Sequence, residues 1–165
     1  LKNIFNYSHY NQKIDGLGYL GVDGDVTVID SAELGNIIHR MIKDYGSIKG
    51  DGYRIREFKK SIKYFSTKFD KVIIIFPPVT NIWRASILNT NIEDFNQNII
   101  LKTEEFVKTE NLSNTFVWDF YNKSDFQIND SDYYDTHHLN NNGAVKFTKK
   151  LREKLDNLSD SIYEP

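Results

Sequence analysis

The chain has 165 residues, a formal net charge of -2 and no cysteine. This length suits one domain with its own hydrophobic core. A hydrophobic content of 39% and a charged content of 27% argue against a disordered tail and against a membrane-spanning protein. The lack of cysteine excludes disulfide frameworks, zinc ribbons and thiol catalysis. Because positive and negative side chains are interspersed, we expect no nucleic-acid partner, and we expect no membrane contact from the visible chain.

The first part of the chain alternates weak and strong structural signals. Residues 1–25 mix aromatic side chains with Asn and Gly without a sustained period, so we expect an irregular N-terminal segment. Residues 26–29 are a short β-branched run that predicts a strand. A helix should follow, begun by a capping box at Asp30 and Glu33 and ended by Gly46.

A second helix is predicted after a glycine-containing loop at residues 50–52. Its apolar residues recur at steps of three and four, which is typical of an amphipathic helix with one exposed face. These residues are Ile55, Phe58, Ile62, Phe65 and Phe69.

Residues 72–76 form an apolar run without a polar break, the pattern of a parallel strand covered on both faces. Pro77 and Pro78 should end this strand. We expect a loop next, containing Asn81, Trp83 and Arg84, in which the last two side chains suit either sugar contact or local packing.

The second half of the chain predicts two further helices and one more strand. A helix should begin near Asn91, and a strand at residues 116–118 should end at Asp119. A polar loop over residues 122–142 precedes a last helix, whose inward side chains should be Ala144, Phe147, Leu151 and Leu155.

This order of elements predicts an α/β fold with a parallel sheet. We expect residues 72–76 and 116–118 to pair in parallel, because a helix between them returns the chain to the same edge. The prediction is one domain over residues 1–165, with its sheet-and-helix core in residues 26–158.

The polar loop before the last helix holds the densest group of reactive side chains. Ligands of open parallel sheets collect beyond the carboxyl ends of the strands, which directs attention to this loop. Asp135 and His138 are three residues apart on a segment that enters a helix. A carboxylate that holds Nδ1–H leaves Nε2 to accept a proton, so this pair suits an orienting acid and a general base.

The segment from Asp135 to Ala144, followed by a helix, resembles the last D-x-x-H block of the SGNH (GDSL-like) hydrolases. The strand that ends in Pro77 and Pro78, and the strand that ends in Asp119, are similar to the fourth and fifth strands of that fold. The likeness covers roughly residues 50–155 and is nearest to the branch of cell-envelope O-acyl transfer proteins.

The resemblance implies a three-layer sandwich with a parallel sheet in flavodoxin-like order. It also implies an esterase or O-acyltransferase that acts on a carbohydrate, an acylated small molecule or a cell-envelope polymer. Asp135 would be the acid and His138 the base of a Ser-His-Asp triad, with no cofactor. The location, cell envelope or cytoplasm, and the oligomeric state stay open.

The chain departs from this family because it lacks a recognisable G-D-S nucleophile and oxyanion-hole residues. Leu1 is not an initiator methionine, so we expect the nucleophile and the first strands upstream of it. Ser31 is the weaker candidate within the chain, because Asp30 and Ser31 are more simply explained as a helix N-cap.

Two alternatives remain beside the triad. Asp132, Asp135, His137 and His138 offer oxygen and nitrogen donors for a metal, although a solvated polar loop is the commoner explanation, and no metal is predicted. The other alternative is a non-catalytic carbohydrate-binding or assembly domain on the same scaffold.

Overall fold

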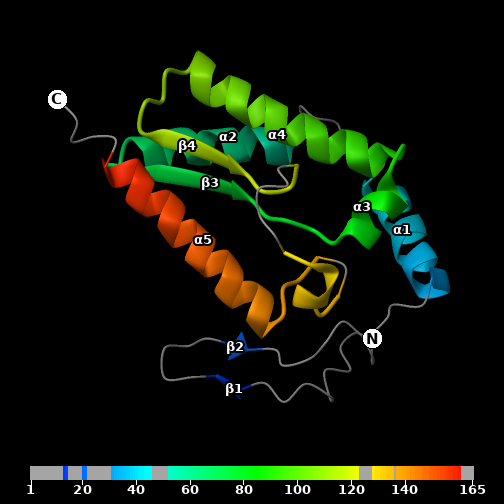
Figure 1. The fold of residues 1–165 in the computed structure, drawn as a ribbon. Coiled ribbons are helices and arrows are strands. Elements are labelled where there is room, and N and C mark those ends of the chain that lie inside the picture. The colour runs from blue at the N-terminus through cyan, green and yellow to red at the C-terminus, as the bar shows by residue number, and fades with distance from the viewer. Residues whose placement is uncertain are drawn as a thin grey trace. The chain divides into compact units, whose positions relative to one another are not determined.

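The computed structural model describes residues 13–14, 20–21, 31–45, 52–122, 128–135 and 137–160. Together they form a mixed α/β fold with a small parallel sheet of two strands (Figure 1). The chain divides into two compact units. We call Asp30–Asp125 the sheet unit, and we call Leu1–Ile29 together with Phe126–Pro165 the loop–helix unit. The predicted single domain stays a prediction.

The two strands of the sheet unit are β3 (Val72–Phe76) and β4 (Thr115–Asp119), and they pair in parallel. Val72 lies opposite Thr115, and Phe76 lies opposite Asp119. Helix α4 (Asn91–Thr109) connects them. The predicted parallel pairing across a helical crossover is therefore confirmed.

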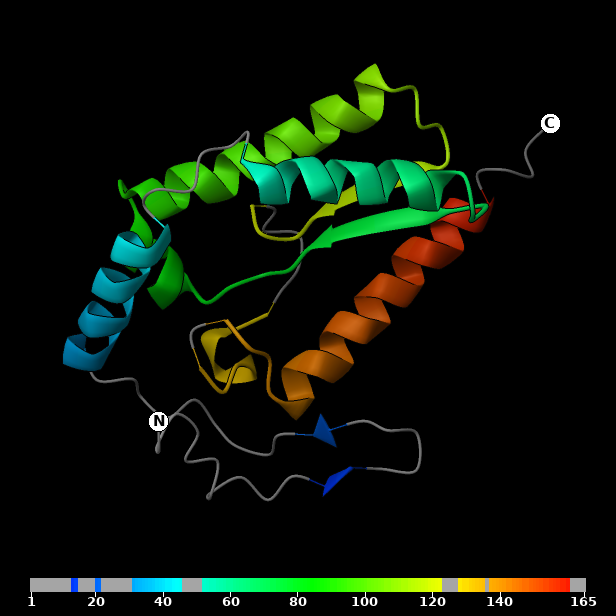
Figure 2. The same cartoon turned by 180° about the vertical axis from the view of Figure 1, so that it is seen from behind.

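Helix α2 (Tyr53–Ser66) and α4 lie side by side along the strands (Figure 2). Lys63 Nζ lies 2.5 Å from Glu110 Oε2, and Lys59 Nζ lies 5.3 Å from the centre of the Phe106 ring. The inner faces of the two helices supply buried aliphatic side chains, namely Ile55, Ile62, Ile92 and Ile100.

Three predictions about burial in the sheet unit are wrong. Ile75 is exposed and the rest of β3 is half-buried, so β3 is not covered on both faces, because the helices of the sheet unit that lie along the strands, α2 and α4, are side by side. Phe65 and Phe69 are exposed as well. Phe65 lies in the last turn of α2 and Phe69 lies beyond the end of the helix at Ser66, so both follow the last buried residue of α2, Ile62.

The prediction of a loop after Pro78 is also wrong, because residues 81–87 form helix α3 (Asn81–Ile87). The Thr80 side chain caps this helix by accepting a hydrogen bond from the Trp83 N–H at 3.0 Å. Trp83 is buried, and Arg84 donates to the Tyr121 carbonyl oxygen and stacks on the Tyr121 ring. Both side chains thus serve local packing.

Helix α1 (Ser31–Tyr45) contacts α3 and α4. The predicted strand at residues 26–29, the cap at Asp30 and the stop at Gly46 lie outside the described residues.

In the loop–helix unit, the expectation of an irregular segment over residues 1–25 is wrong in one place. Strands β1 (Lys13–Ile14) and β2 (Leu20–Gly21) form an antiparallel pair. Each strand is two residues long, which is too short to show an alternating pattern of side chains in the sequence.

The predicted polar loop contains a short 3-10 helix, η1 (Asp130–Asp132), and leads into α5 (Asn141–Asp160). Leu155 is exposed, contrary to the prediction, because residues 152–157 are all exposed and the inward stripe ends before them. Among the described residues, every helix is too short or too polar to cross a membrane.

Candidate active site: an aspartate and histidine pair

The loop that carries the predicted acid and base is held to α5 by a buried carboxylate, that of Asp132. The Asp132 side chain is almost fully buried, and Lys146 Nζ of α5 lies 2.7 Å and 2.8 Å from its two oxygens. Asp132 also accepts a hydrogen bond from the Asn129 N–H at 3.0 Å, which closes a capping box around η1. This ion pair fixes η1 to the first turns of α5.

Asn140 joins the loop to the start of α5. Its N–H donates to the Asp132 carbonyl oxygen at 2.9 Å, and its side-chain amide donates to the Ser131 carbonyl oxygen at 2.8 Å. Its side-chain oxygen accepts from the Gly143 N–H at 3.0 Å, as an N-cap does. Asn140 therefore satisfies backbone groups of both the helix and the loop.

Gly143 lets these two segments approach. A Cβ atom at this position would lie 2.1 Å from the Asp132 carbonyl oxygen, far inside van der Waals contact. Only glycine fits here without a shift of the backbone. Asn140 and Gly143 thus have structural roles in the segment that follows His138.

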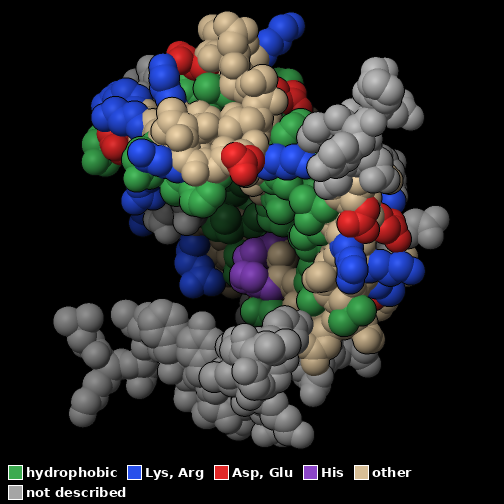
Figure 3. All heavy atoms as spheres, turned by 90° about the vertical axis from the view of Figure 1, so that its left-hand side faces the viewer, with side chains coloured by type: hydrophobic (Ala, Val, Ile, Leu, Met, Phe, Trp, Pro, Cys, Tyr) green, Lys and Arg blue, Asp and Glu red, His purple; other side chains and the backbone are tan. Residues whose placement is uncertain are grey.

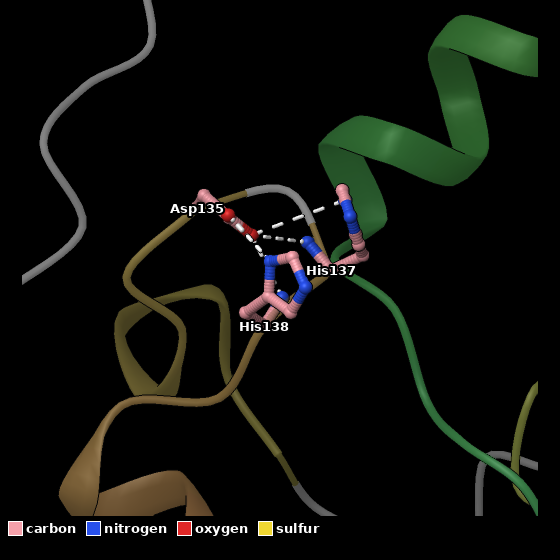
Figure 4. A group of neighbouring side chains, drawn as sticks. All are labelled: Asp135, His137 and His138. Carbon is pink, nitrogen blue, oxygen red and sulfur yellow. Dashed lines mark hydrogen bonds and ion pairs between the residues drawn. The ribbon is translucent and has the colours of Figure 1, made fainter. Parts of the chain in front are cut away.

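A tight reversal of the chain brings the acid and the base together. Tyr133 and Leu139 form an antiparallel bridge, and the Tyr134 N–H donates to the His138 carbonyl oxygen at 3.0 Å. Asp135 and His138 lie inside this reversal (Figure 4).

The Asp135 carboxylate is held on both oxygens. Oδ2 lies 2.6 Å from His138 Nδ1, the predicted contact, which is therefore confirmed. Oδ1 accepts hydrogen bonds from the His137 N–H at 2.9 Å and from the His138 N–H at 2.7 Å. The carboxylate is oriented before any substrate arrives.

These contacts set the protonation of the acid. Burial alone raises the pKa of Asp135, but the hydrogen bonds from the His137 N–H and from the His138 ring and N–H outweigh burial. The net effect holds the pKa of Asp135 below its usual value. The carboxylate is therefore ionised at neutral pH and favours a proton on His138 Nδ1.

His138 presents its other nitrogen, Nε2, away from Asp135. Its side chain is 56% exposed, and its ring stacks on Tyr134 with centroids 5.5 Å apart and planes 15° apart. Histidine side chains are visible at the surface of the molecule in Figure 3. The ring of His138 is thus oriented on one side by Asp135 and on its face by Tyr134.

His137 lies in a different position from His138. Its Nδ1 is 3.9 Å from Asp135 Oδ1, beyond hydrogen-bond distance, although its ring centre is 4.1 Å from that of His138. Burial lowers the pKa of His137, and the neighbouring His138 adds to this effect, while Asp135 opposes it. Geometry therefore favours His138 as the partner of the acid.

The same residues include donors for a metal ion. Asp135, His137 and His138 each offer one ligand atom, and these atoms lie within 4.8 Å of one another. Two imidazoles and one carboxylate form a donor set that zinc and similar ions accept. Asp132 does not belong to this group, and its carboxylate is paired with Lys146.

The sequence pattern identified Asp135 and His138 but not the residues that support them. Asn140, which directly precedes the last helix, could have been recognised as an N-cap. No sequence signal reveals the pairing of Asp132 with Lys146 or the clash at Gly143, because both depend on the tertiary path of the chain. Ser31 is the first residue of α1, and its side chain lies outside the described part.

The chain matches no known protein family, no curated protein sequence and no solved structure. The functional argument therefore rests on the chemistry of the site.

Proposed function

We propose that this protein is an SGNH-like esterase or O-acyltransferase that acts on acyl groups of a carbohydrate or a cell-envelope polymer. His138 is the general base and Asp135 is the acid that orients it. One observation carries the proposal, namely the 2.6 Å contact between Asp135 Oδ2 and His138 Nδ1, on a carboxylate whose other oxygen is fixed by two backbone N–H groups.

This arrangement supports proton transfer at a defined atom. With Nδ1–H held by Asp135, His138 Nε2 accepts the proton of a serine hydroxyl as the serine oxygen attacks the acyl carbonyl carbon. The imidazolium then gives that proton to the leaving alkoxide, and an acyl-enzyme remains. Water or a sugar hydroxyl attacks the acyl-enzyme in the second step, and Nε2 accepts the proton of that nucleophile. The bond between the acyl carbon and the serine oxygen then breaks, and the imidazolium returns the proton to the serine oxygen.

The parallel pairing of β3 and β4 supports the wider fold that we propose, a three-layer sandwich in flavodoxin-like order. The proposal requires a serine hydroxyl within about 3 Å of His138 Nε2 in the working protein. It also requires N–H donors for the oxyanion.

The test is labelling with a fluorophosphonate, applied to the protein isolated from the cells that make it, with the labelled peptide identified by mass spectrometry. We expect one labelled serine, and we expect His138→Ala to abolish the label. The same substitution should lower the turnover of a small acetyl ester by about 10³-fold or more, because the serine loses its proton acceptor.

His137→Ala is the matched control, since it removes a neighbouring imidazole that lies beyond hydrogen-bond distance of Asp135. We expect this variant to keep most of its turnover. Equal losses in the two variants would contradict the assignment of the base and favour joint ligation of a metal by both rings. A protein that takes no label at any serine would contradict the enzyme proposal and favour the non-catalytic binding domain.

A further inference from the structure

Helix α2 and the turn that follows it carry a concentration of positive charge that the balanced overall composition hides. Residues 52–71 contain seven of the 21 Lys and Arg side chains of the chain, but only two of its 23 Asp and Glu side chains. The chain as a whole has a net charge of -2. An anionic partner is therefore attracted to this helix more strongly than to the average surface.

The C-terminal end of α2 also exposes three aromatic side chains next to one another. The side chains of Tyr64, Phe65 and Phe69 are 59%, 45% and 58% exposed. The rings of Tyr64 and Phe65 are 5.7 Å apart, and those of Phe65 and Phe69 are 5.9 Å apart. A cluster of exposed apolar rings is uncommon on a protein surface and marks an interaction site.

Two lysines lie near these rings in the chain. Lys68 Nζ lies 5.7 Å from the centre of the Tyr64 ring, and Lys60 stands one helical turn before Tyr64 on the same side of the helix. We call the set Lys60, Tyr64, Phe65, Lys68 and Phe69 the aromatic–lysine surface. The side chain of Lys60 is 73% exposed, although its ammonium group also contacts Glu57.

The backbone holds this surface in place. The side-chain amide of Asn114 donates to the carbonyl oxygens of Ser66 and Phe69, at 2.9 Å and 2.8 Å. The N–H groups of Lys68 and Phe69 bond back to the Phe65 carbonyl oxygen. Tyr64 and Phe65 thus project from the last turn of α2 and Phe69 from a turn held by Asn114, so the backbone needs little further ordering when a partner binds.

The orientation of the rings distinguishes between anionic partners. The planes of Tyr64 and Phe65 are 63° apart, and those of Phe65 and Phe69 are 52° apart. Nucleic-acid bases and sugar rings bind on flat, separate stacking platforms, whereas Tyr64 and Phe65 meet edge to face and Phe65 and Phe69 are steeply tilted. Two of the three are Phe, which has no polar atom to bond a sugar.

We propose that the aromatic–lysine surface binds the surface of a bilayer that contains anionic phospholipids. The lysines are attracted to the lipid phosphates, and the rings of Phe65 and Phe69 enter the boundary between headgroups and acyl chains. Contact is shallow and reversible. This replaces the expectation of no membrane contact, and it is independent of the chemistry of Asp135 and His138.

The test is flotation of the full chain with two kinds of vesicle, phosphatidylcholine alone and phosphatidylcholine with about one third phosphatidylglycerol. We expect binding to the anionic vesicles only. The double variant Phe65→Ser/Phe69→Ser and the double variant Lys60→Gln/Lys68→Gln should each lower the partition coefficient about tenfold or more. Thermal unfolding checks that both variants are folded. We expect both to be folded, because the substituted side chains are exposed.

Matched controls change the same chemistry elsewhere. Leu101→Ser removes an exposed apolar side chain of α4, and Lys43→Gln/Lys149→Gln removes two exposed lysines from α1 and α5. We expect both controls to bind like the parent protein. Equal losses in controls and test variants would show a diffuse effect of charge and hydrophobicity, and would overturn the proposal.

A reporter at the surface gives an independent measurement. The chain has two tryptophans, Trp83 and Trp118, and both are buried, so Phe69→Trp adds one exposed indole. Its emission should shift to shorter wavelength with anionic vesicles but not with inorganic phosphate, which separates a bilayer from a phosphate ion. An unshifted emission would overturn the proposal. Binding of a soluble polyanion that is unchanged in the variant Phe65→Ser/Phe69→Ser would also overturn the proposal, because it would indicate that the partner is an anionic polymer.

Discussion

The sheet unit and the loop–helix unit are stabilised by different kinds of contact. The sheet unit buries aliphatic and aromatic side chains from three helices and β4, among them Ile62, Ile87 and Trp118. The loop–helix unit places a carboxylate and an amide, Asp132 and Asn140, in its buried interior beside Tyr133. Apolar contacts are non-directional, whereas hydrogen bonds fix angles as well as distances. The unit that buries a carboxylate and an amide is the one that orients the proposed acid and base.

The largest expected effect on stability is the removal of an apolar contact from the sheet unit. Ile87 is completely buried in α3, so Ile87→Ala should lower the free energy of unfolding by about 3 to 4 kcal/mol through lost burial and the cavity left behind. Denaturant titration of the full chain measures this loss. Leu101→Ala is the control, because Leu101 is exposed, and a similar loss there would contradict the assignment of the core.

One glycine-to-alanine pair compares the two units directly. Gly143→Ala places a Cβ atom 2.1 Å from the Asp132 carbonyl oxygen and should lower the free energy of unfolding by about 3 kcal/mol. Gly35→Ala adds the same methyl group to an exposed position of α1 with no atom within 4 Å, and it should raise that free energy by about 0.5 to 1 kcal/mol. The opposite signs are read from two thermal unfolding curves. Equal effects would mean that the path of the chain at Gly143 is different.

Alkaline pH should act on the sheet unit. Burial, followed by the hydrogen bond and the charge of Glu93, raises the pKa of Tyr121 to about 12. Because this pKa is raised in the folded state, the stability that it contributes is complete below the ordinary tyrosine pKa of about 10 and is lost as pH rises toward 12. The loss should be on the order of 2 kcal/mol. Tyr121→Phe should flatten the pH dependence of stability in this window, and an unchanged slope would contradict it.

The helix cap of the loop–helix unit gives a smaller expected effect. Asn140→Ala removes the acceptor for the Gly143 N–H and the donor to Ser131, and it should cost about 1 to 2 kcal/mol. Asn142→Ala, two residues further on and exposed, should change stability by less than about 0.5 kcal/mol. Chemical denaturation of both variants tests the difference. A loss that is confined to Asn142→Ala would contradict the position of the cap.

The sequence was most informative where local pattern and tertiary structure agree. The apolar run at residues 72–76, the helix from Asn91 and the contact between Asp135 and His138 depend on neighbours in the chain, and they are present in the structure. Helix α3 was missed because its one strong signal, the Thr80 cap, follows two prolines that indicate a loop.

Burial was harder to predict, because periodicity shows which side chains share a face but not where the partner surface ends. Phe69 and Leu155 continue an apolar stripe beyond its packing surface, and both are exposed. The ion pair of Asp132 with Lys146 depends on residues 14 apart that meet only in the folded chain. Composition also hid the basic character of α2, since a balanced total says nothing about local charge.

Acid should act on the loop–helix unit, and this is the smallest effect that we expect. The pKa of Asp135 is lowered in the folded state, although burial alone would raise it, because hydrogen bonds from His137 and His138 favour the carboxylate. A depressed pKa contributes stability above the pKa of the unfolded chain, about 3.9, and that stability is lost as pH falls below it. Asp135→Asn should therefore flatten the acid limb of the stability curve but leave the alkaline limb, which Tyr121 governs, unchanged. Stability is measured by denaturant titration at a series of pH values. An acid limb that is as steep in Asp135→Asn as in the parent chain would show that other carboxylates carry it, and a changed alkaline limb would show that the two effects are not separate.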